Sequence, residues 1–285
     1  MPERALPGTR MLPFFLDSPR GPLFCLFTAP ADTAPLGGVL YLHPFAEEMH
    51  KSRRMAAIQA RALAARGQAV LQVDLTGCGD SAGDFGDASW SAWREDARLA
   101  HAWLADRIGQ PVALWGLRTG ATLAADLARD QSAVRQLILW QPVVNGDMFL
   151  NQFLRIKLAS EMLADGQAQS GTKTLRAQLA AGDSVEVGGN RLAPDMAREL
   201  GAIRLADCVP PCPVHWLEVG AAAGAAATPA SQRVIDAWQA AGMAVHTQTV
   251  AGDAFWLTQE IAECPALVEA TLSVFSPGPA GRHAA

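Results

Sequence analysis

Residues 112–129, with the sequence VALWGLRTGATLAADLAR, decide the fold of this chain. The first four residues of the stretch are apolar and predict a buried strand, and the last ten have the apolar spacing of a helix. Gly116 and Gly120 stand two residues before and two residues after Arg118. Small residues at these two places let a chain turn sharply from strand to helix. The central side chain, here Arg118, then stands above the end of the sheet.

Working outward from this stretch, short apolar runs alternate with segments of helical spacing. Strands this uniformly apolar suit a parallel sheet that is covered on both faces, and the turn residues 17–21 predict an antiparallel hairpin at the start. We therefore expect an α/β fold with about eight strands, mostly parallel, helices on both faces and a helical cap. The predicted strands are 12–16, 23–28, 39–42, 69–75, 112–115, 137–140, 214–219 and 243–250, and the predicted helices are 53–66, 90–107, 120–129, 230–241 and 257–273.

Residues 143–207 interrupt the alternation. They contain amphipathic pieces at 148–163, 174–181 and 194–200, and a Gly-rich polar joint at 182–190. We interpret residues 143–207 as an inserted helical cap, and residues 1–142 with 208–285 as the core that carries it. The last ten residues, 276–285, are expected to be frayed.

The glycine spacing around Arg118 matches the nucleophile elbow G-x-S-x-G, and the whole chain resembles the α/β-hydrolase superfamily. Two long stretches narrow the resemblance: residues 43–55 (HPFAEEMHKSRRM) and residues 74–87 (DLTGCGDSAGDFGD). They are similar to the bacterial group called exosortase A system-associated hydrolase 2. That resemblance implies a hydrolase associated with exosortase-directed (PEP-CTERM) protein sorting and exopolysaccharide production, with proteins of the exosortase locus as partners.

The chain departs from the superfamily pattern at all three positions of a Ser/His/acid triad. The apex of the elbow is Arg118, and a protonated guanidinium has no lone pair with which to attack a carbonyl. The loop after the last strand contains Asp253 where the superfamily has histidine, and residues 220–225 contain no carboxylate. The resemblance to an active hydrolase is therefore weakest where catalysis is expected.

A relocated triad would have to use other residues. His43 precedes the oxyanion loop, where we favour a role in supporting that loop over proton transfer, and for His50 we favour a position on the surface. Thr119 is expected to cap the following helix. Ser81 belongs to a turn-rich loop, and Cys78 has no base nearby in the sequence. None of the three is a strong candidate for the nucleophile.

Arg118 is better suited to hold an anion. The elbow places it beside a helix N-terminus and opposite the backbone amides of Phe45 and Ala46, at the oxyanion position. The alternative is that a carboxylate of the chain neutralises it in a buried ion pair. The candidates for that partner are Asp253, Glu47 and Glu48.

The expected ligand pocket therefore lies around Arg118, and no metal is expected there. Aromatic and apolar side chains could line a chamber beside it, although such residues more often form a simple core. The predicted pocket residues are His43, Phe45, Ala46, Arg118, Thr119, Asp253 and Trp256. The residues of the possible chamber are Phe45, Met148, Phe149, Phe153, Met162 and Trp256.

Composition excludes several classes of function. The chain has 285 residues, and its 23 basic and 28 acidic residues give a net charge of −5, with no basic cluster for nucleic acid. No apolar run has the roughly 18 residues of a membrane span, and the first residues do not form a signal peptide, so we expect a cytoplasmic protein. Five scattered cysteines predict neither disulfides nor zinc.

No cofactor is expected either. Residues 77–82 match the dinucleotide fingerprint G-x-G-x-x-A, but turn residues and carboxylates follow where a helix would have to begin.

Three hypotheses remain. The first is a non-catalytic or atypical member of the superfamily, a possible pseudoenzyme, that binds an anionic or acyl-bearing small molecule through Arg118. The second is an active ester or thioester hydrolase with a relocated nucleophile. The third is a scaffold in protein-sorting or exopolysaccharide machinery.

Overall fold

The computed structural model describes residues 8–131, 133–165 and 171–275, so the expected frayed tail lies outside the described residues. The strands are β1 (Thr9–Leu16), β2 (Leu23–Pro30), β3 (Gly37–Leu42), β4 (Gln68–Val73), β5 (Val112–Leu117), β6 (Val134–Trp140), β7 (Val185–Val187), β8 (Asn190–Leu192), β9 (Val214–Gly220) and β10 (Val245–Ala251). The helices are α1 (Glu47–Ala65), η1 (Phe85–Asp87), α2 (Trp90–Ile108), α3 (Thr119–Arg129), α4 (Gly146–Asp165), α5 (Thr172–Ala181), α6 (Pro194–Ala202), η2 (Leu205–Asp207), α7 (Pro229–Ala240) and α8 (Pro265–Val274).

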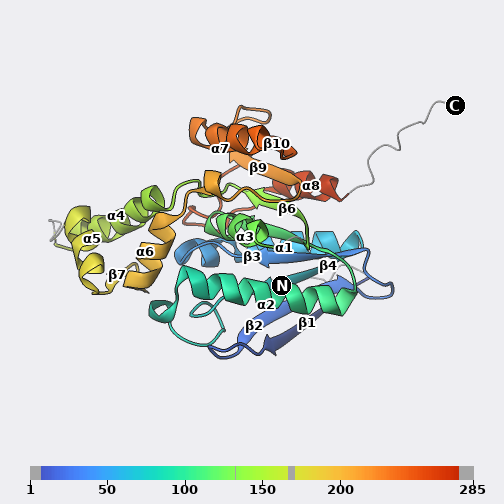
Figure 1. Ribbon diagram of the computed structural model, residues 1–285, viewed down its shortest axis with the longest axis horizontal. Helices are drawn as coiled ribbons and strands as arrows, with labels where there is room; N and C mark the ends of the chain where they lie inside the picture. The colour runs from blue at the N-terminus through green and yellow to red at the C-terminus, as the bar shows by residue number, and fades with distance from the viewer. Residues whose placement is uncertain (1–7, 132, 166–170, 276–285) are drawn as a thin grey trace.

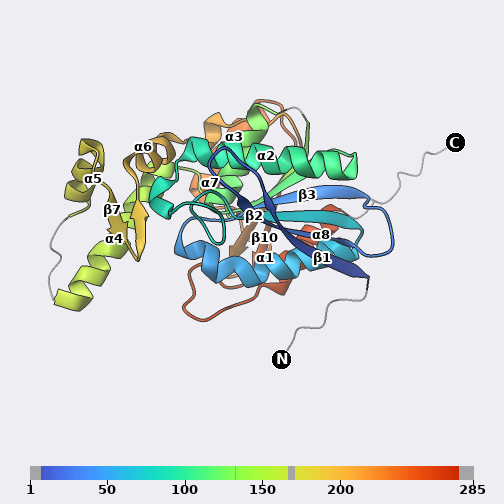
Figure 2. The ribbon, with the colours of Figure 1, turned by 90° about the horizontal axis from the view of Figure 1, so that it is seen from below.

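The described strands form one large sheet of eight strands in the order β1-β2-β4-β3-β5-β6-β9-β10. β1 is antiparallel to β2 and β2 to β4, whereas neighbouring strands in the series β4-β3-β5-β6-β9-β10 run parallel. Figures 1 and 2 show α2, α3 and α7 on one face of the sheet and α1 and α8 on the other. The prediction of a mostly parallel sheet covered on both faces is confirmed.

The side chains along each strand point alternately to the two faces of the sheet, so the core has two layers, one on each face. On the side of α1 and α8, Trp115 packs against Trp140 with ring centroids 4.8 Å apart. On the side of α7, Trp216 packs edge-on against Trp238, with centroids 5.8 Å apart. Since successive residues of a strand point to opposite faces, apolar strands of this kind supply side chains to both layers.

Three predicted boundaries were wrong. α1 begins at Glu47 rather than at residue 53, because the acidic residues at its start belong to the first helical turn, where they interact favourably with the helix dipole. The Gly-rich joint 182–190 folds in part into the β7-β8 hairpin, with Gly188 and Gly189 at positive φ in the turn. α8 begins only at Pro265, which supplies the favourable first position of a helix.

The segment between β6 and β9 holds α4, α5, β7, β8, α6 and η2. Figures 1 and 2 show its helices beyond one end of the large sheet. At the base of the segment, the amide of Gly146 donates to the carbonyl of Ile203 at 3.1 Å, which holds the entering and leaving chains together. β5 and β6 run parallel, so the segment begins at the same edge of the sheet as the turn at Arg118.

Candidate functional site

The turn at Arg118 joins β5 directly to α3. Arg118 has φ 57° and ψ −118°, a strained backbone conformation for a residue with a side chain. Its amide donates to the carbonyl of Trp140 on the neighbouring strand at 2.9 Å. A Cβ atom at Gly120 would lie 2.1 Å from the carbonyl oxygen of Leu42, so only glycine fits there. The predicted sharp turn with Arg118 at its apex is thus present.

The side chain of Arg118 pairs with one of the three candidate carboxylates. Its Nε lies 3.3 Å from Oε1 of Glu48, and its guanidinium carbon lies 5.7 Å from the centre of the Trp256 ring. Glu47 pairs with Lys51 instead, and Asp253 is exposed. Across the part of the chain that the structure describes, no carboxylate accepts a hydrogen bond from the two terminal nitrogens of Arg118.

Glu48 is buried in the first turn of α1. Burial raises the pKa of its carboxyl group, and the charge of Arg118 offsets part of that increase. Its second oxygen, Oε2, has no hydrogen-bond partner among the described residues. A single hydrogen bond therefore joins the pair, and neither partner uses its full hydrogen-bonding capacity.

The loop between β3 and α1 contains a residue with a strained backbone and two backbone amides without acceptors among the described residues. Ala46 has φ 49° and ψ −124°, close to the conformation of Arg118, and it immediately precedes α1. Within residues 8–131, 133–165 and 171–275, the backbone N–H groups of Phe45 and Ala46 have no acceptor. These two donors are consequently available at the start of a helix.

His43 is buried, and both of its ring nitrogens contact the backbone. Nδ1 lies 2.8 Å from the carbonyl oxygen of Pro44, and Nε2 accepts a hydrogen bond from the amide of Leu75 at 3.2 Å. The two contacts together define a neutral ring protonated on Nδ1. Burial lowers the pKa of His43, which further favours the neutral form. The ring thus links the loop after β3 to the loop after β4.

The remaining candidate side chains are not arranged as a nucleophile and base. Ser81 donates to the carbonyl of Asp74 and accepts from the amide of Phe24. Cys78 is buried, and burial raises the pKa of its thiol strongly. His50 is exposed.

Thr119 was expected to cap α3, but the cap position belongs to Arg118, and the buried Thr119 hydroxyl has no partner among the described residues. The expectation of a cap was wrong because the helix starts one residue earlier.

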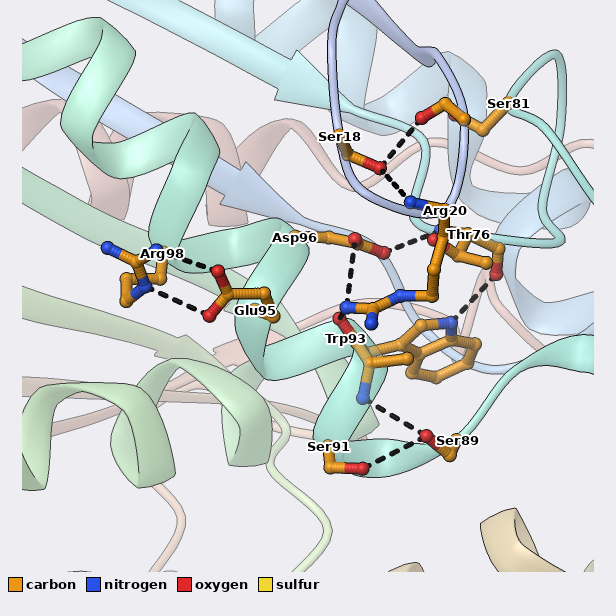
Figure 3. Close-up of polar contacts among 12 residues, drawn as sticks. Ser18, Arg20, Thr76, Ser81, Ser89, Ser91, Trp93, Glu95, Asp96 and Arg98 are labelled. Atoms are coloured by element: carbon orange, nitrogen blue, oxygen red, sulfur yellow. Dashed lines mark hydrogen bonds and ion pairs between the residues drawn. The ribbon is translucent and has the colours of Figure 1, made fainter.

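A buried carboxylate that the sequence reasoning missed holds the loop after β4. Asp96 of α2 accepts a hydrogen bond from the amide of Thr76 at 2.8 Å, and the indole of Trp93 donates to the carbonyl of Thr76 at 3.0 Å (Figure 3). Arg20 lies 3.7 Å from Asp96. Burial raises the pKa of Asp96. An acidic residue among the apolar positions of α2 was the signal available in the sequence.

A cavity of about 200 Å³ opens beside the elbow. Among the residues predicted for the pocket, Arg118 alone lines it. The others come from the loop after β6, α4 and the start of α7. The lining residues are Arg118, Gln141, Pro142, Val143, Val144, Asn145, Met148, Phe149, Gln152, Thr228, Ala230 and Ser231.

Of the residues considered for an apolar chamber, two line the cavity beside Arg118, namely Met148 and Phe149, and four do not, namely Phe45, Phe153, Met162 and Trp256. The Phe45 ring packs edge-on against Phe149 and Phe153, with centroids 5.6 and 5.1 Å away, so these rings form core. Met148 and Met162 are each 58% exposed. Aromatic side chains at the base of the inserted segment gain more from burial against each other than from lining an open space.

The fold and the elbow turn together define an α/β hydrolase. Residues 33–186, more than half of the chain, match the family model Hydrolase_4, described as serine aminopeptidase, S33, and the chain belongs to this family. Among curated proteins, no sequence matches the chain significantly.

Several solved structures share the fold at low sequence identity. Est1E from Butyrivibrio proteoclasticus, solved with ferulic acid bound, has a TM-score of 0.67 at 17% identity, covering 92% of this chain and 97% of that one. The alpha/beta hydrolase GrgF from Penicillium sp. sh18 has a TM-score of 0.62 at 17% identity, with 94% and 97% covered. The thioesterase domain from the curacin biosynthetic pathway has a TM-score of 0.58 at 15% identity, with 94% and 100% covered.

None of the helices within the described ranges has both the length and the apolarity needed to cross a membrane.

Proposed function

We propose that this protein is a non-catalytic or atypical α/β hydrolase that binds an anionic or acyl-bearing small molecule at Arg118. The observation that carries the proposal is the position of Arg118 and the hydrogen bonding of its guanidinium. Arg118 stands at the apex of the elbow and lines a cavity, and its guanidinium donates one hydrogen bond to Glu48, from Nε. The two terminal nitrogens form the planar fork that binds a carboxylate or phosphate through two parallel hydrogen bonds.

The surroundings of Arg118 support an anion. The side chain lies at the N-terminal end of α3, and the unpaired amides of Phe45 and Ala46 lie at the N-terminal end of α1. Helix N-termini carry partial positive charge, so a negative group beside them is stabilised. Glu48 neutralises part of the charge of Arg118, and an anionic ligand would share the guanidinium with it.

The same proposal includes the loss of the hydrolytic triad. Arg118 occupies the place of the nucleophile, and Asp253 follows β10 at the place of the histidine. Glu218 is the acidic residue of β9, two residues before the strand ends. Its carboxylate accepts hydrogen bonds from the indole of Trp216 at 3.0 Å and from the amide of Thr228 at 3.3 Å. A carboxylate used in this way is part of the β9-α7 connection rather than a partner for a base.

Calorimetry tests the proposal. The full chain is titrated with hexanoate, D-gluconate and inorganic phosphate, and the same titrations are made with Arg118→Met and Arg198→Ala. Arg198 lies on α6, is largely exposed and pairs with Asp195 and Glu199, so its substitution removes one cation that does not line the cavity. We expect Arg118→Met to weaken binding of at least one anion by at least about tenfold, and Arg198→Ala to leave it unchanged. Equal binding by the parent and Arg118→Met would contradict the proposal.

One observation favours a second candidate, an ester or thioester hydrolase with a relocated nucleophile. The hydroxyl of Thr119 is buried next to Arg118 and lacks a partner among the described residues. A fluorophosphonate probe followed by mass mapping separates the two functions. A stoichiometric adduct on Thr119 would favour the hydrolase. No adduct and no turnover of short-chain nitrophenyl esters would favour the binding protein.

The resemblance to exosortase A system-associated hydrolase 2 adds three further points to the proposal. The protein is cytoplasmic, its partners include proteins of the exosortase locus, and residues 143–207 act as a cap on the elbow and as a docking surface. Co-purification from native lysate tests the partners. A protein that purifies as a lone chain would count against a scaffold role.

A further inference from the structure

We infer that the ligand of the cavity beside Arg118 is a short carboxylic acid that carries several hydroxyl groups, rather than an aliphatic acid or an acyl chain. The inference rests on the proposed function, because Arg118 is the group that would bind the carboxylate. It goes further by assigning the chemistry of the rest of the ligand from the groups that line the cavity.

Two residues that line the cavity, Gln141 and Asn145, have carboxamide oxygens that already accept hydrogen bonds. Oε1 of Gln141 accepts a hydrogen bond from the amide of Val219 at 2.9 Å, and Oδ1 of Asn145 accepts one from the amide of Met148 at 3.0 Å. These contacts orient each carboxamide. Over the described ranges no acceptor is recorded for Nε2 of Gln141 or Nδ2 of Asn145, so both N–H₂ groups remain available as donors.

Residues at the start of α7 supply further polar groups to the lining of the cavity. The hydroxyl of Thr228 caps this helix by accepting from the amide of Ser231 at 3.2 Å, and it donates to the Ser231 hydroxyl at 3.0 Å. The amide of Ala230 lies in the first helical turn and has no acceptor within the part of the chain that the structure describes. Gln152, an exposed residue of α4, contributes a third carboxamide to the lining.

The carboxylates near the cavity do not occupy these donors. Glu48 contacts Nε of Arg118, and Glu218 accepts from Trp216 and from the backbone of Thr228. Asp147, at the start of α4, forms an ion pair with Arg176 of α5 at 2.7 Å. Neither Glu48, Glu218 nor Asp147 lines the cavity. The donors of Gln141, Asn145 and Ala230 are thus left for a ligand.

The volume of the cavity and the apolar residues on one side of it restrict the class of ligand further. The cavity of about 200 Å³ is smaller than the roughly 300–1,000 Å³ of drug-sized sites, which favours a short ligand. Val143, Val144, Met148 and Phe149 form its apolar side. A chain of hydroxylated carbons presents hydroxyl groups to the amides and C–H groups to this wall, whereas an aliphatic chain would leave the amide donors desolvated without acceptors.

The test compares D-gluconate with hexanoate, two acids of equal charge and equal carbon number. Each is titrated into the full chain by calorimetry, and then into Asn145→Ser and Asn190→Ser. Serine at residue 145 keeps an oxygen that can cap α4 but removes the N–H₂ donor. Asn190→Ser is the matched control in the β7-β8 hairpin, where the Asn190 side chain donates to the carbonyl of Gly188.

We expect D-gluconate to bind at least about tenfold more tightly than hexanoate, and Asn145→Ser to weaken gluconate alone by about five- to tenfold. Asn190→Ser leaves both affinities unchanged. Hexanoate binding as tightly as gluconate, with Arg118→Met abolishing both, would overturn the inference and keep the proposed function. An equal loss of both acids in Asn145→Ser would also overturn it. No binding of gluconate, hexanoate or phosphate at about 10 mM would overturn the proposed function itself.

Discussion

Nε of Arg118 and Oε1 of Glu48 lie 3.3 Å apart, which joins the turn after β5 to the first turn of α1. Both side chains are largely buried, so each has lost most of its hydration. In such a pair, desolvation offsets much of the mutual attraction, and the net contribution to stability is small. Removal of one partner is costly, because the other charge then remains buried without compensation.

Arg118→Met is therefore expected to destabilise the protein more than the double variant Arg118→Met/Glu48→Leu. We expect a loss of about 3 kcal/mol for the single variant and about 1 kcal/mol for the double variant, measured by urea unfolding at pH 8. Without Arg118, the pKa of Glu48 rises further, because the charge that offsets its burial is gone. The carboxyl group then takes up a proton more readily as the pH falls, so the loss in the single variant becomes smaller at pH 5 than at pH 8.

Glu48→Leu alone completes the double-mutant cycle for this pair. A double variant as unstable as the sum of the two single variants would show that the two side chains do not interact in solution.

Gly120→Ala is expected to prevent the elbow from packing against β3. The added methyl group would lie 2.1 Å from the carbonyl oxygen of Leu42 and 2.5 Å from that of His43, and both contacts are with backbone. We expect a loss of about 3 kcal/mol or more, seen as a lower midpoint in thermal unfolding. Gly171→Ala is the control, because Gly171 has φ −105° and nothing lies within 4 Å of its added Cβ. Equal midpoints for the two variants would contradict the assigned elbow geometry.

Much of this architecture follows from local sequence. The apolar runs of β3 and β5 are fully buried in the sheet, so their composition alone identified them. The turn at Arg118 was predictable because the glycines act on the adjacent backbone. Helix starts were less certain, since Glu47 and Glu48 are equally compatible with a loop before a helix and with the first turn of α1.

The partners within the site depend on contacts between distant segments. The sequence left Asp253, Glu47 and Glu48 open as partners of Arg118, and the start of α1 at Glu47 decides between them, because it turns Glu48 inward and Glu47 toward Lys51. Gln141 and Asn145 were missed for a similar reason. Their roles depend on Val219 of β9 and on the start of α4, which no local pattern reveals.

The thiols are expected to be unreactive in the folded protein. All five cysteines are buried, and burial raises the pKa of Cys25 and Cys208 to about 12 and that of Cys212 to about 11. The thiolate is the reactive form, so labelling by iodoacetamide at pH 8 should be at least about 100-fold slower than for a free thiol. Mass spectrometry should find five labels in urea and almost none in its absence. Rapid native labelling at Cys78 would instead support a cysteine nucleophile.

Acid is expected to destabilise the protein in part through His215. Its ring stacks on that of His246, with centroids 5.1 Å apart, and burial together with the neighbouring His246 lowers the pKa of His215 from 6.5 to about 4. Between these two values the unfolded chain binds more protons at this site than the folded protein does. This contribution to stability is therefore complete above pH 6.5 and is lost as the pH falls toward 4.

The variant His215→Gln removes this contribution, so its free energy of unfolding should fall less steeply than that of the parent between pH 6.5 and 4. Buried Glu48 and Asp96 act in the opposite direction, because burial raises their pKa values and stabilises the folded state more at low pH. They are the same in both proteins and cancel in the difference. Urea unfolding at pH 4.5, 5.5 and 7 measures that difference, and parallel curves would show that the His215 ring titrates equally in the folded and unfolded states.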